Sequence, residues 1–122
     1  MFEMVKEFHQ VFDIPARTEL YYPTLEEIEL RLRLIKEEHD EIIDAIERET
    51  IYDVAKELAD CIYVILGTAL TFGIDIDKVF EEVHRSNMTK LDEFGKPVRR
   101  EDGKVIKSSL YEPANIRKVL GQ

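Results

Sequence analysis

Apolar residues recur every three or four positions along the first two thirds of the chain, which is the period of an amphipathic α-helix. In residues 1–12 they fall at spacings of four, three and four, which predicts a short helix that ends before Pro15. Thr24, with Glu27 three positions later, has the pattern of a capping box, so a helix is predicted over residues 25–48. Its buried stripe is predicted to contain Ile28, Leu32, Ile35, Ile42 and Ile46, with His39 at the missing position.

Two further helices follow, and together the four segments predict an all-α antiparallel helix bundle. The link Arg48-Glu49-Thr50-Ile51 is short, so the next helix, over about residues 52–72, is expected to run antiparallel to its neighbour. Gly73 suits a left-handed C-cap at its end. A fourth helix is predicted from Asp75 or Asp77 to about Met88, with an apolar face of its own.

The last third of the chain has a different pattern. Turn signals at residues 93–97 and 101–104 flank the short segment 98–100, which predicts a small hairpin or ordered loop. This region also concentrates the basic side chains Lys90, Lys96, Arg99, Arg100, Lys104, Lys107, Arg117 and Lys118. They are either solvated loop charges or a phosphate-binding flap.

Composition limits the class of protein. A chain of 122 residues predicts a single domain over residues 1–122. The balance of 17 basic and 26 acidic residues gives a net charge of −9, which argues against binding nucleic-acid polymers. Cys61 is the single cysteine, so an intrachain disulfide is excluded. Since the longest apolar run is interrupted and too short to span a bilayer, we expect no membrane association and a cytoplasmic location.

Two acidic clusters fall on the second and third predicted helices. Glu38 and Glu41 lie about 60° apart on one helix, with Glu37 beside them, and Glu57 and Asp60 have the same spacing on the next. No basic residue is expected in register with them. Asp60 also precedes the apolar run 61–72, which is expected to be largely buried, where an unpaired carboxylate is costly. Facing clusters would form an all-oxygen site suited to Mg²⁺, with Mn²⁺ second. The alternative is that the glutamates belong to a solvated face.

Three polar side chains have ambiguous positions. His39 lies in an apolar stripe, so it is predicted to be a packed or interface histidine rather than a metal ligand. His9 and Gln10 at the end of the first helix are either ordinary exposed residues or a polar pair that faces a ligand.

The sequence resembles the all-α nucleoside triphosphate pyrophosphohydrolases, which include the MazG-like and phosphoribosyl-ATP pyrophosphohydrolase-like branches. The resemblance is carried by Glu38-x-x-Glu41, fifteen intervening residues and Glu57-x-x-Asp60, with Glu37 directly before them. The segment from Val83 to Lys90, followed by Leu91-Asp92 and Gly95-Lys96-Pro97, extends it.

The resemblance implies a Mg²⁺-dependent hydrolase that cleaves a nucleoside triphosphate between the α and β phosphates, giving a nucleoside monophosphate and pyrophosphate. It also implies a homodimer or a dimer of dimers. Glu38, Glu41, Glu57 and Asp60 would then bind metal, and Glu37 would orient the attacking water or help to bind a second ion. Asn87 and Lys90, with Arg85 as a further candidate, would bind phosphate or sugar, and His9 and Gln10 would contribute to a base pocket.

Other functions stay open at this stage. Nothing in the sequence specifies a phosphoribosyl group, which favours house-cleaning of the nucleotide pool, with phosphoribosyl-ATP hydrolysis as the alternative. Glu81-x-x-His84 has the spacing used in di-iron bundles, but such a site needs two of these motifs and the chain has one. A non-enzymatic acidic helical dimerisation module would explain the charge but not Asp60.

Overall fold

A computed structural model describes residues 1–48 and 50–121. The chain forms two compact units, Met1–Ile74 and Asp75–Gln122. Most described residues are helical, with one small two-stranded sheet, so the predicted all-α class and the small hairpin are confirmed. A single domain over the whole chain stays a prediction.

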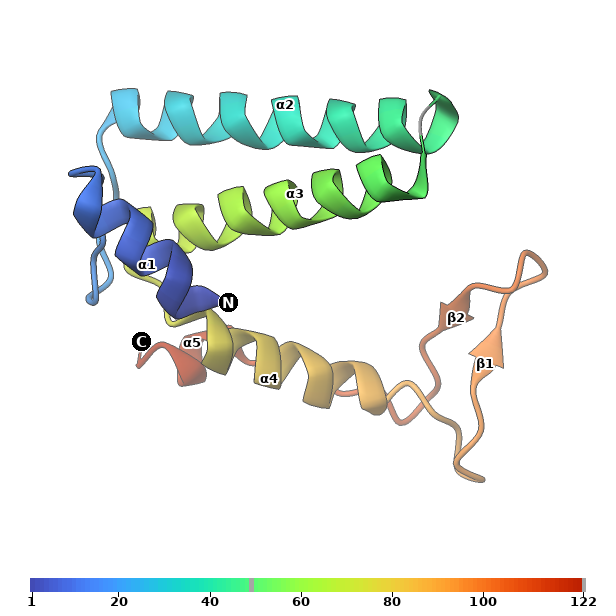
Figure 1. Cartoon of the computed structure of the whole chain (residues 1–122). Helices are drawn as coiled ribbons and strands as arrows, with labels where there is room; N and C mark the ends of the chain where they lie inside the picture. The colour runs from blue at the N-terminus through green and yellow to red at the C-terminus, as the bar shows by residue number, and fades with distance from the viewer. Residues whose placement is uncertain (49, 122) are drawn as a thin grey trace. The chain divides into compact units, whose positions relative to one another are not determined.

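The first unit contains three helices, α1 (Phe2–Val11), α2 (Leu25–Arg48) and α3 (Ile51–Phe72). Helices α2 and α3 lie side by side and antiparallel, and α1 packs against α3 (Figure 1). The connector between α1 and α2 is fixed to the end of α3, because the backbone amides of Arg17 and Tyr21 donate to the carbonyls of Leu70 and Phe72 at 2.9 and 3.0 Å.

The ends of α2 and α3 are capped by side chains. Thr24 Oγ1 accepts a hydrogen bond from the amide of Glu27, as the sequence predicts, but the Glu27 carboxylate pairs with the Arg17 guanidinium instead of completing the capping box. A full capping box, which sequence analysis missed, joins Thr50 and Asp53 at the start of α3. Glu49, in the predicted link, lies outside the described residues. Gly73 closes α3 with φ 67° and ψ 31°, which confirms the left-handed cap.

The face of α2 that packs on α3 differs from the predicted stripe. It is centred on Arg31, Glu38 and Ala45, which recur every seven residues; Arg31 and Ala45 are buried and Glu38 is half-buried. Leu32 and Ile46 are instead 62% and 63% exposed, so their predicted burial is wrong for the isolated chain. The apolar positions of α2 belong to two adjacent faces, and the sequence stripe merged them.

The apolar run of α3 is likewise only partly buried. Gly67, Ala69, Leu70 and Thr71 are buried, but Ile62 and Ile65 are 43% and 45% exposed, so the expectation of a largely buried run is wrong within one chain. The exposed apolar residues on these two helices include Leu25, Leu32, Ile43, Ile46, Ile51, Leu58, Ile62 and Ile65. Besides the face by which α2 and α3 pack on each other, these helices thus have an exposed apolar face. Exposed apolar faces of this kind are typical of interaction surfaces.

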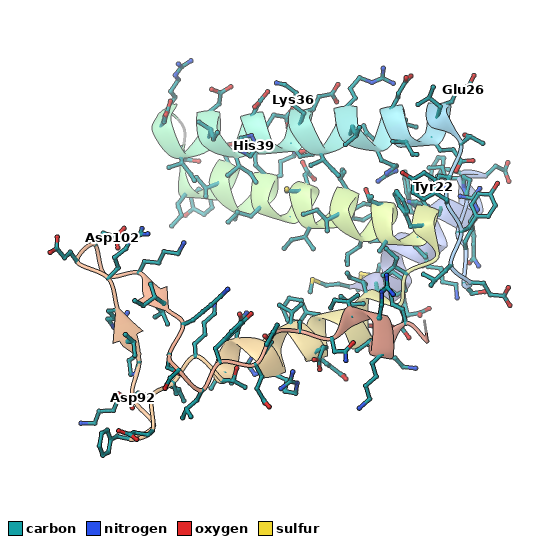
Figure 2. All side chains as sticks on the ribbon, turned by 180° about the vertical axis from the view of Figure 1, so that it is seen from behind. Tyr22, Glu26, Lys36, His39, Asp92 and Asp102 are labelled. Atoms are coloured by element: carbon teal, nitrogen blue, oxygen red, sulfur yellow. The ribbon has the colours of Figure 1, made fainter. Side chains whose placement is uncertain are left out.

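The second unit contains α4 (Ile76–Met88), the strands β1 (Val98–Arg99) and β2 (Val105–Ile106), and the short helix α5 (Ile116–Val119). The strands are antiparallel, with Val98 opposite Ile106. Sequence analysis did not predict α5. Asp92 and Asp102 lie at opposite ends of the hairpin (Figure 2), where each carboxylate accepts hydrogen bonds from backbone amides of its turn.

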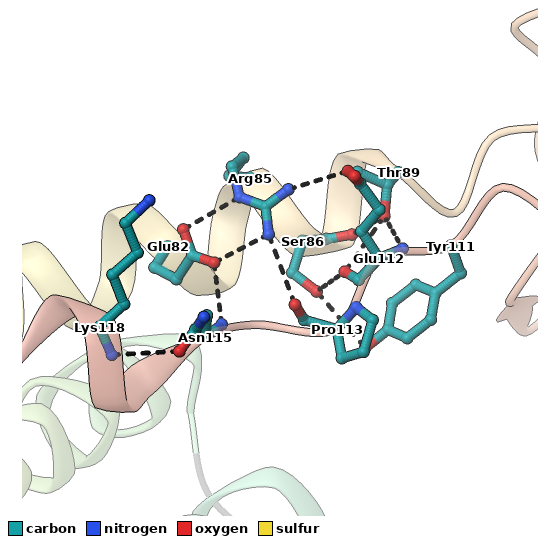
Figure 3. Close-up of polar contacts among 9 residues, drawn as sticks. All are labelled: Glu82, Arg85, Ser86, Thr89, Tyr111, Glu112, Pro113, Asn115 and Lys118. Carbon is teal, nitrogen blue, oxygen red and sulfur yellow. Dashed lines mark hydrogen bonds and ion pairs between the residues drawn. The ribbon is translucent and has the colours of Figure 1, made fainter. Parts of the chain in front are cut away.

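Polar side chains on one face of α4 bind the C-terminal segment (Figure 3). The Glu82 carboxylate accepts from the amide of Asn115 at 2.9 Å and from the Arg85 guanidinium at 2.8 and 3.0 Å. Buried Ser86 donates to the carbonyl of Glu112 at 2.7 Å. The Arg85 guanidinium and the Asn115 amide together hold the pKa of Glu82 at about 2. The segment is therefore attached along successive turns of α4.

No helix among the described residues is, taken singly, long and apolar enough to cross a bilayer, although α3 and α4 taken together have the necessary length and composition.

Candidate metal centre

Four carboxylates meet between α2 and α3. Glu38 and Glu41 come from α2, and Glu57 and Asp60 from α3. One oxygen from each lies within 4.8 Å of the others. The i, i+3 spacing places each pair on one helix face, and the antiparallel packing of the helices makes the two pairs face one another. The structure thus brings together the four residues predicted as metal ligands.

The cluster is electrostatically unfavourable without a cation. Glu38 Oε2 and Glu57 Oε2 are buried and have no hydrogen-bond partner among the described residues. A hydrogen bond with Glu57, together with the negative charge of Glu38 and Glu57, raises the pKa of Glu41 to about 7. At pH 7 Glu41 is therefore protonated in about half of the molecules, whereas an isolated glutamate would have lost its proton.

One base lies in register with the acids, contrary to the sequence expectation. Lys56 Nζ is 2.8 Å from Asp60 Oδ2 and 3.4 Å from Glu57 Oε1. The signal was present, since Lys56 and Asp60 are four residues apart on one helix. Asp60 is also less buried than expected, with 39% of its side chain exposed. Lys56 offsets one of the four negative charges, and over residues 1–48 and 50–121 no basic side chain pairs with Glu38 or Glu41.

These residues fit a hard divalent cation. Buried polar atoms are nearly always hydrogen-bonded, so two buried oxygens without a partner, on two carboxylates of one cluster, indicate a missing partner. The donors are all oxygens, which suits Mg²⁺ or Mn²⁺ better than Zn²⁺. A hydrogen-bond donor or acceptor without charge would not neutralise the excess negative charge of the four carboxylates.

Two neighbours of the cluster are placed differently. Glu37 is exposed and is not among the four clustered carboxylates, so its predicted part in water orientation or in a second ion site stays a prediction. His39 is also exposed, with 67% of its side chain accessible and Nδ1 3.2 Å from Asp40 Oδ1. The packed alternative is therefore wrong within one chain, while a role in an interface stays a prediction.

His9 of α1 is buried against Gly67 of α3 and is not exposed to a ligand. Its Nδ1 lies 2.9 Å from the carbonyl of Pro15, so this nitrogen carries the proton. Burial lowers the pKa of His9, and the charge of Arg31 adds to this effect although the bond to Pro15 opposes it. Gln10, by contrast, is exposed. The two residues of the predicted polar pair therefore differ in burial, and a base pocket formed by both stays a prediction.

Arg31, which sequence analysis did not single out, is 6% exposed and sits beside His9. Its guanidinium donates to the carbonyl of Val64 at 2.8 Å and to Thr68 Oγ1 at 3.1 Å. Gly67 makes room for both side chains, because a Cβ there would lie 2.7 Å from Arg31 Nη2 and from His9 Nε2. A glycine inside a strongly apolar helix was the available signal for this close approach.

The predicted phosphate ligands lie in the second unit. Asn87 is exposed and Lys90 is half-buried. Arg85 donates through all three guanidinium nitrogens to Glu82, Glu112 and the carbonyl of Pro113. Its donors therefore already serve the attachment of the C-terminal segment.

Comparisons with known proteins agree with this arrangement. A family model described as phosphoribosyl-ATP pyrophosphohydrolase matches residues 5–87, which include all four clustered carboxylates. An uncharacterized protein of Acanthamoeba polyphaga mimivirus is 30% identical over 100 residues, covering 79% of this chain. The match spans 38% of that relative's length.

Proposed function

We propose, because the chain belongs to the phosphoribosyl-ATP pyrophosphohydrolase family within the MazG-like all-α superfamily, that it hydrolyses a nucleoside triphosphate between the α and β phosphates. The products are a nucleoside monophosphate and pyrophosphate. Family membership supports pyrophosphohydrolase activity on nucleotide-type substrates, and the family is metal-dependent in general. We further propose that the substrate is a nucleoside triphosphate and that the protein has a house-cleaning role in the nucleotide pool.

The observation that carries the proposal is the set of four carboxylates with two orphaned buried oxygens. Mg²⁺ held there would neutralise phosphate oxygens, lower the pKa of a bound water and stabilise charge that develops in the displacement. Glu38, Glu41, Glu57 and Asp60 would provide its ligands, and exposed Glu37, next to Glu38 in the sequence, would orient the attacking water. Glu41 would give up its proton when a cation is bound, since the protonated carboxyl is a poor ligand.

Asn87 and Lys90 are proposed to hold the phosphates or the sugar, because an amide and an ammonium group supply fixed donors in place of water. We leave Arg85 out of this set, since its nitrogens are bonded to Glu82, Glu112 and Pro113. The identity of the base would be read in part by exposed Gln10. His9 contributes by packing rather than by contact.

The active form is proposed to be a homodimer or a dimer of dimers. The exposed apolar residues of α2 and α3, from Leu25 to Ile65, form a face that water solvates poorly. His39 lies among them on α2, where a second copy of the chain would cover it. The small set of fully buried apolar side chains, Val5, Ala45, Ala69 and Leu70, supports a core completed by a partner.

The deciding experiment incubates the protein with Mg²⁺ and a panel of canonical, deoxy and damaged nucleoside triphosphates, with phosphoribosyl-ATP as a further substrate. Pyrophosphate is then separated from orthophosphate among the products. We expect pyrophosphate from one or a few triphosphates and its loss in Glu38→Gln. Glu29→Gln is the matched control, because Glu29 is an exposed glutamate of α2 outside the cluster.

Turnover that survives unchanged in Glu38→Gln would place the reaction elsewhere. Release from phosphoribosyl-ATP alone would replace the triphosphate assignment with the alternative substrate. If no substrate gives pyrophosphate while Mg²⁺ still raises the melting temperature, the carboxylates bind metal without catalysing this reaction.

A further inference from the structure

The hairpin of the second unit borders a groove that the metal centre does not explain. Its cavity of about 420 Å³ is lined by Lys90, Lys104, Val105, Ile106 and Lys107. Three of the five lining residues are therefore lysines, in a chain whose net charge is −9. Like charges gathered around one cavity repel one another, so this arrangement calls for an anion.

Backbone hydrogen bonds fix the segments that carry the three lysines of this cavity. Ser108 Oγ donates to the carbonyl of Leu91 at 2.7 Å, which joins the residue after Lys107 to the residue after Lys90. The amide of Lys104 donates to Asp102 Oδ1 at 3.1 Å, so the start of β2 is fixed by the hairpin turn. The positions of all three lysines thus follow from hydrogen bonds of the hairpin and its base.

Lys107 is also restrained through its side chain. Its Nζ lies 4.7 Å from the centre of the Tyr111 ring, a cation–π distance. Such a contact limits the conformations of a long side chain without neutralising its charge. Binding an anion at this ammonium group consequently costs less conformational entropy than at a free surface lysine.

Nearby carboxylates do not neutralise the three lysines. Asp92 accepts from the amides of Phe94 and Lys96, and Asp102 pairs with the Arg100 guanidinium at 2.6 and 3.1 Å. Over residues 1–48 and 50–121, no carboxylate oxygen lies within 4.0 Å of the ammonium nitrogens that line the groove. The unit as a whole has ten basic and nine acidic residues, against seven and seventeen in residues 1–74.

We propose that this groove is an anion site that binds a phosphoanhydride chain, either inorganic pyrophosphate or the polyphosphate tail of a nucleotide. Lysine ammonium groups are compact point charges that suit phosphate oxygens. Three of them spread around a cavity of this size match an ion with several charged centres better than a single orthophosphate. The choice of ligand rests on the proposed function, whose product is pyrophosphate, and Lys104 and Lys107 are the residues that it adds to Lys90.

Binding of pyrophosphate to the full chain, measured by isothermal titration calorimetry in metal-free buffer, tests the site. Without metal, the acidic cluster repels the anion, so the measured binding reports the groove. We expect binding of pyrophosphate that exceeds binding of orthophosphate, and a loss of about tenfold in affinity for Lys104→Ala or Lys107→Ala, the value of one charge-assisted contact. Lys96→Ala removes the same charge from the same hairpin without lining the groove, and should stay within about twofold of wild type.

Three results would overturn the site: no metal-free binding by the wild-type chain, binding that appears only with Mg²⁺ and is lost in Glu38→Gln, or equal losses in Lys96→Ala and Lys104→Ala. A competition arm with a non-hydrolysable nucleoside triphosphate separates the two sources. Displacement of pyrophosphate assigns the groove to the nucleotide tail, and its absence assigns it to inorganic pyrophosphate, within the same chemistry. Metal-free binding by a protein that hydrolyses no triphosphate would preserve this site while refuting the proposed function.

Discussion

Magnesium affinity should depend strongly on pH because Glu41 holds a proton. Its pKa is raised to about 7 by the hydrogen bond with Glu57 and by the charge of Glu38 and Glu57. A metal ion that uses the Glu41 carboxylate must displace this proton. With a pKa of about 7, the apparent affinity is expected to fall about tenfold at pH 6 and about a hundredfold at pH 5, and to level off above pH 8.

The stability of the metal-free protein should change in the opposite sense. The pKa of Glu41 lies above its unfolded value, so between pH 4.5 and about 7 the folded state binds more protons than the unfolded state. Metal-free stability therefore falls as the pH rises through this window. Mg²⁺ at a fixed concentration of about 100 times the dissociation constant found above pH 8 adds roughly 2.7 kcal/mol to the free energy of unfolding there, and less at lower pH because binding weakens. The difference between the two forms is thus largest at alkaline pH.

Calorimetric titrations with Mg²⁺ from pH 5 to pH 8.5 measure the affinity directly. Repeating them in buffers of different ionisation enthalpy counts the protons released, and we expect about one at pH 6. Glu41→Gln should bind more weakly and lose most of the pH dependence, whereas Glu29→Gln should retain it. An affinity that is flat across this range, or an unchanged dependence in Glu41→Gln, would refute the assignment of the proton to Glu41.

Three further changes test other parts of the molecule. Gly67→Ala should destabilise the fold by roughly 1–2 kcal/mol in urea unfolding, since crowding of Arg31 and His9 outweighs the gain of about 1 kcal/mol in helix propensity; equal or greater stability would show that both side chains move freely. Ile65→Glu should convert the proposed dimer to a monomer in sedimentation measurements by charging the exposed apolar face, and an unchanged mass would exclude that face as the proposed interface. Ser86→Val should lower the free energy of unfolding by about 1–3 kcal/mol and expose the C-terminal segment to protease, because the Glu112 carbonyl loses its 2.7 Å donor. Unaltered cleavage would mean that the hydrogen bonds of Glu82 are enough to hold this segment on α4.

The helices and the metal cluster could be predicted because their signals are local. Spacings of three and four residues located the helices, and the shared i, i+3 spacing paired Glu38 with Glu41 and Glu57 with Asp60. A short link then required the two helices to be antiparallel, which brings the pairs together. The missed helix α5 spans four residues, Ile116–Val119, which is too short for periodicity to detect.

What could not be predicted depends on which helix face meets which neighbour. Leu32 and Arg31 are adjacent in sequence, and propensity would bury the leucine, yet the arginine is buried because Val64 and Thr68 supply its acceptors. Histidine is a residue type that often binds ligands, but His9 is buried against Gly67, which lies 58 positions away in the sequence. Tertiary partners decided each of these positions, and a single sequence does not name them.

The capping box of Thr50 and Asp53 fixes more than the end of a helix. By anchoring the first turn of α3, it sets the angular phase at which Glu57 and Asp60, one and two turns later, face α2. Inserting one residue between this cap and Glu57 would rotate the two acids by about 100° and advance them by about 1.5 Å. Sequence drift in this family should accordingly tolerate substitutions between the cap and the acids far better than changes in length, so an alignment gap there would mark a chain that no longer assembles this centre.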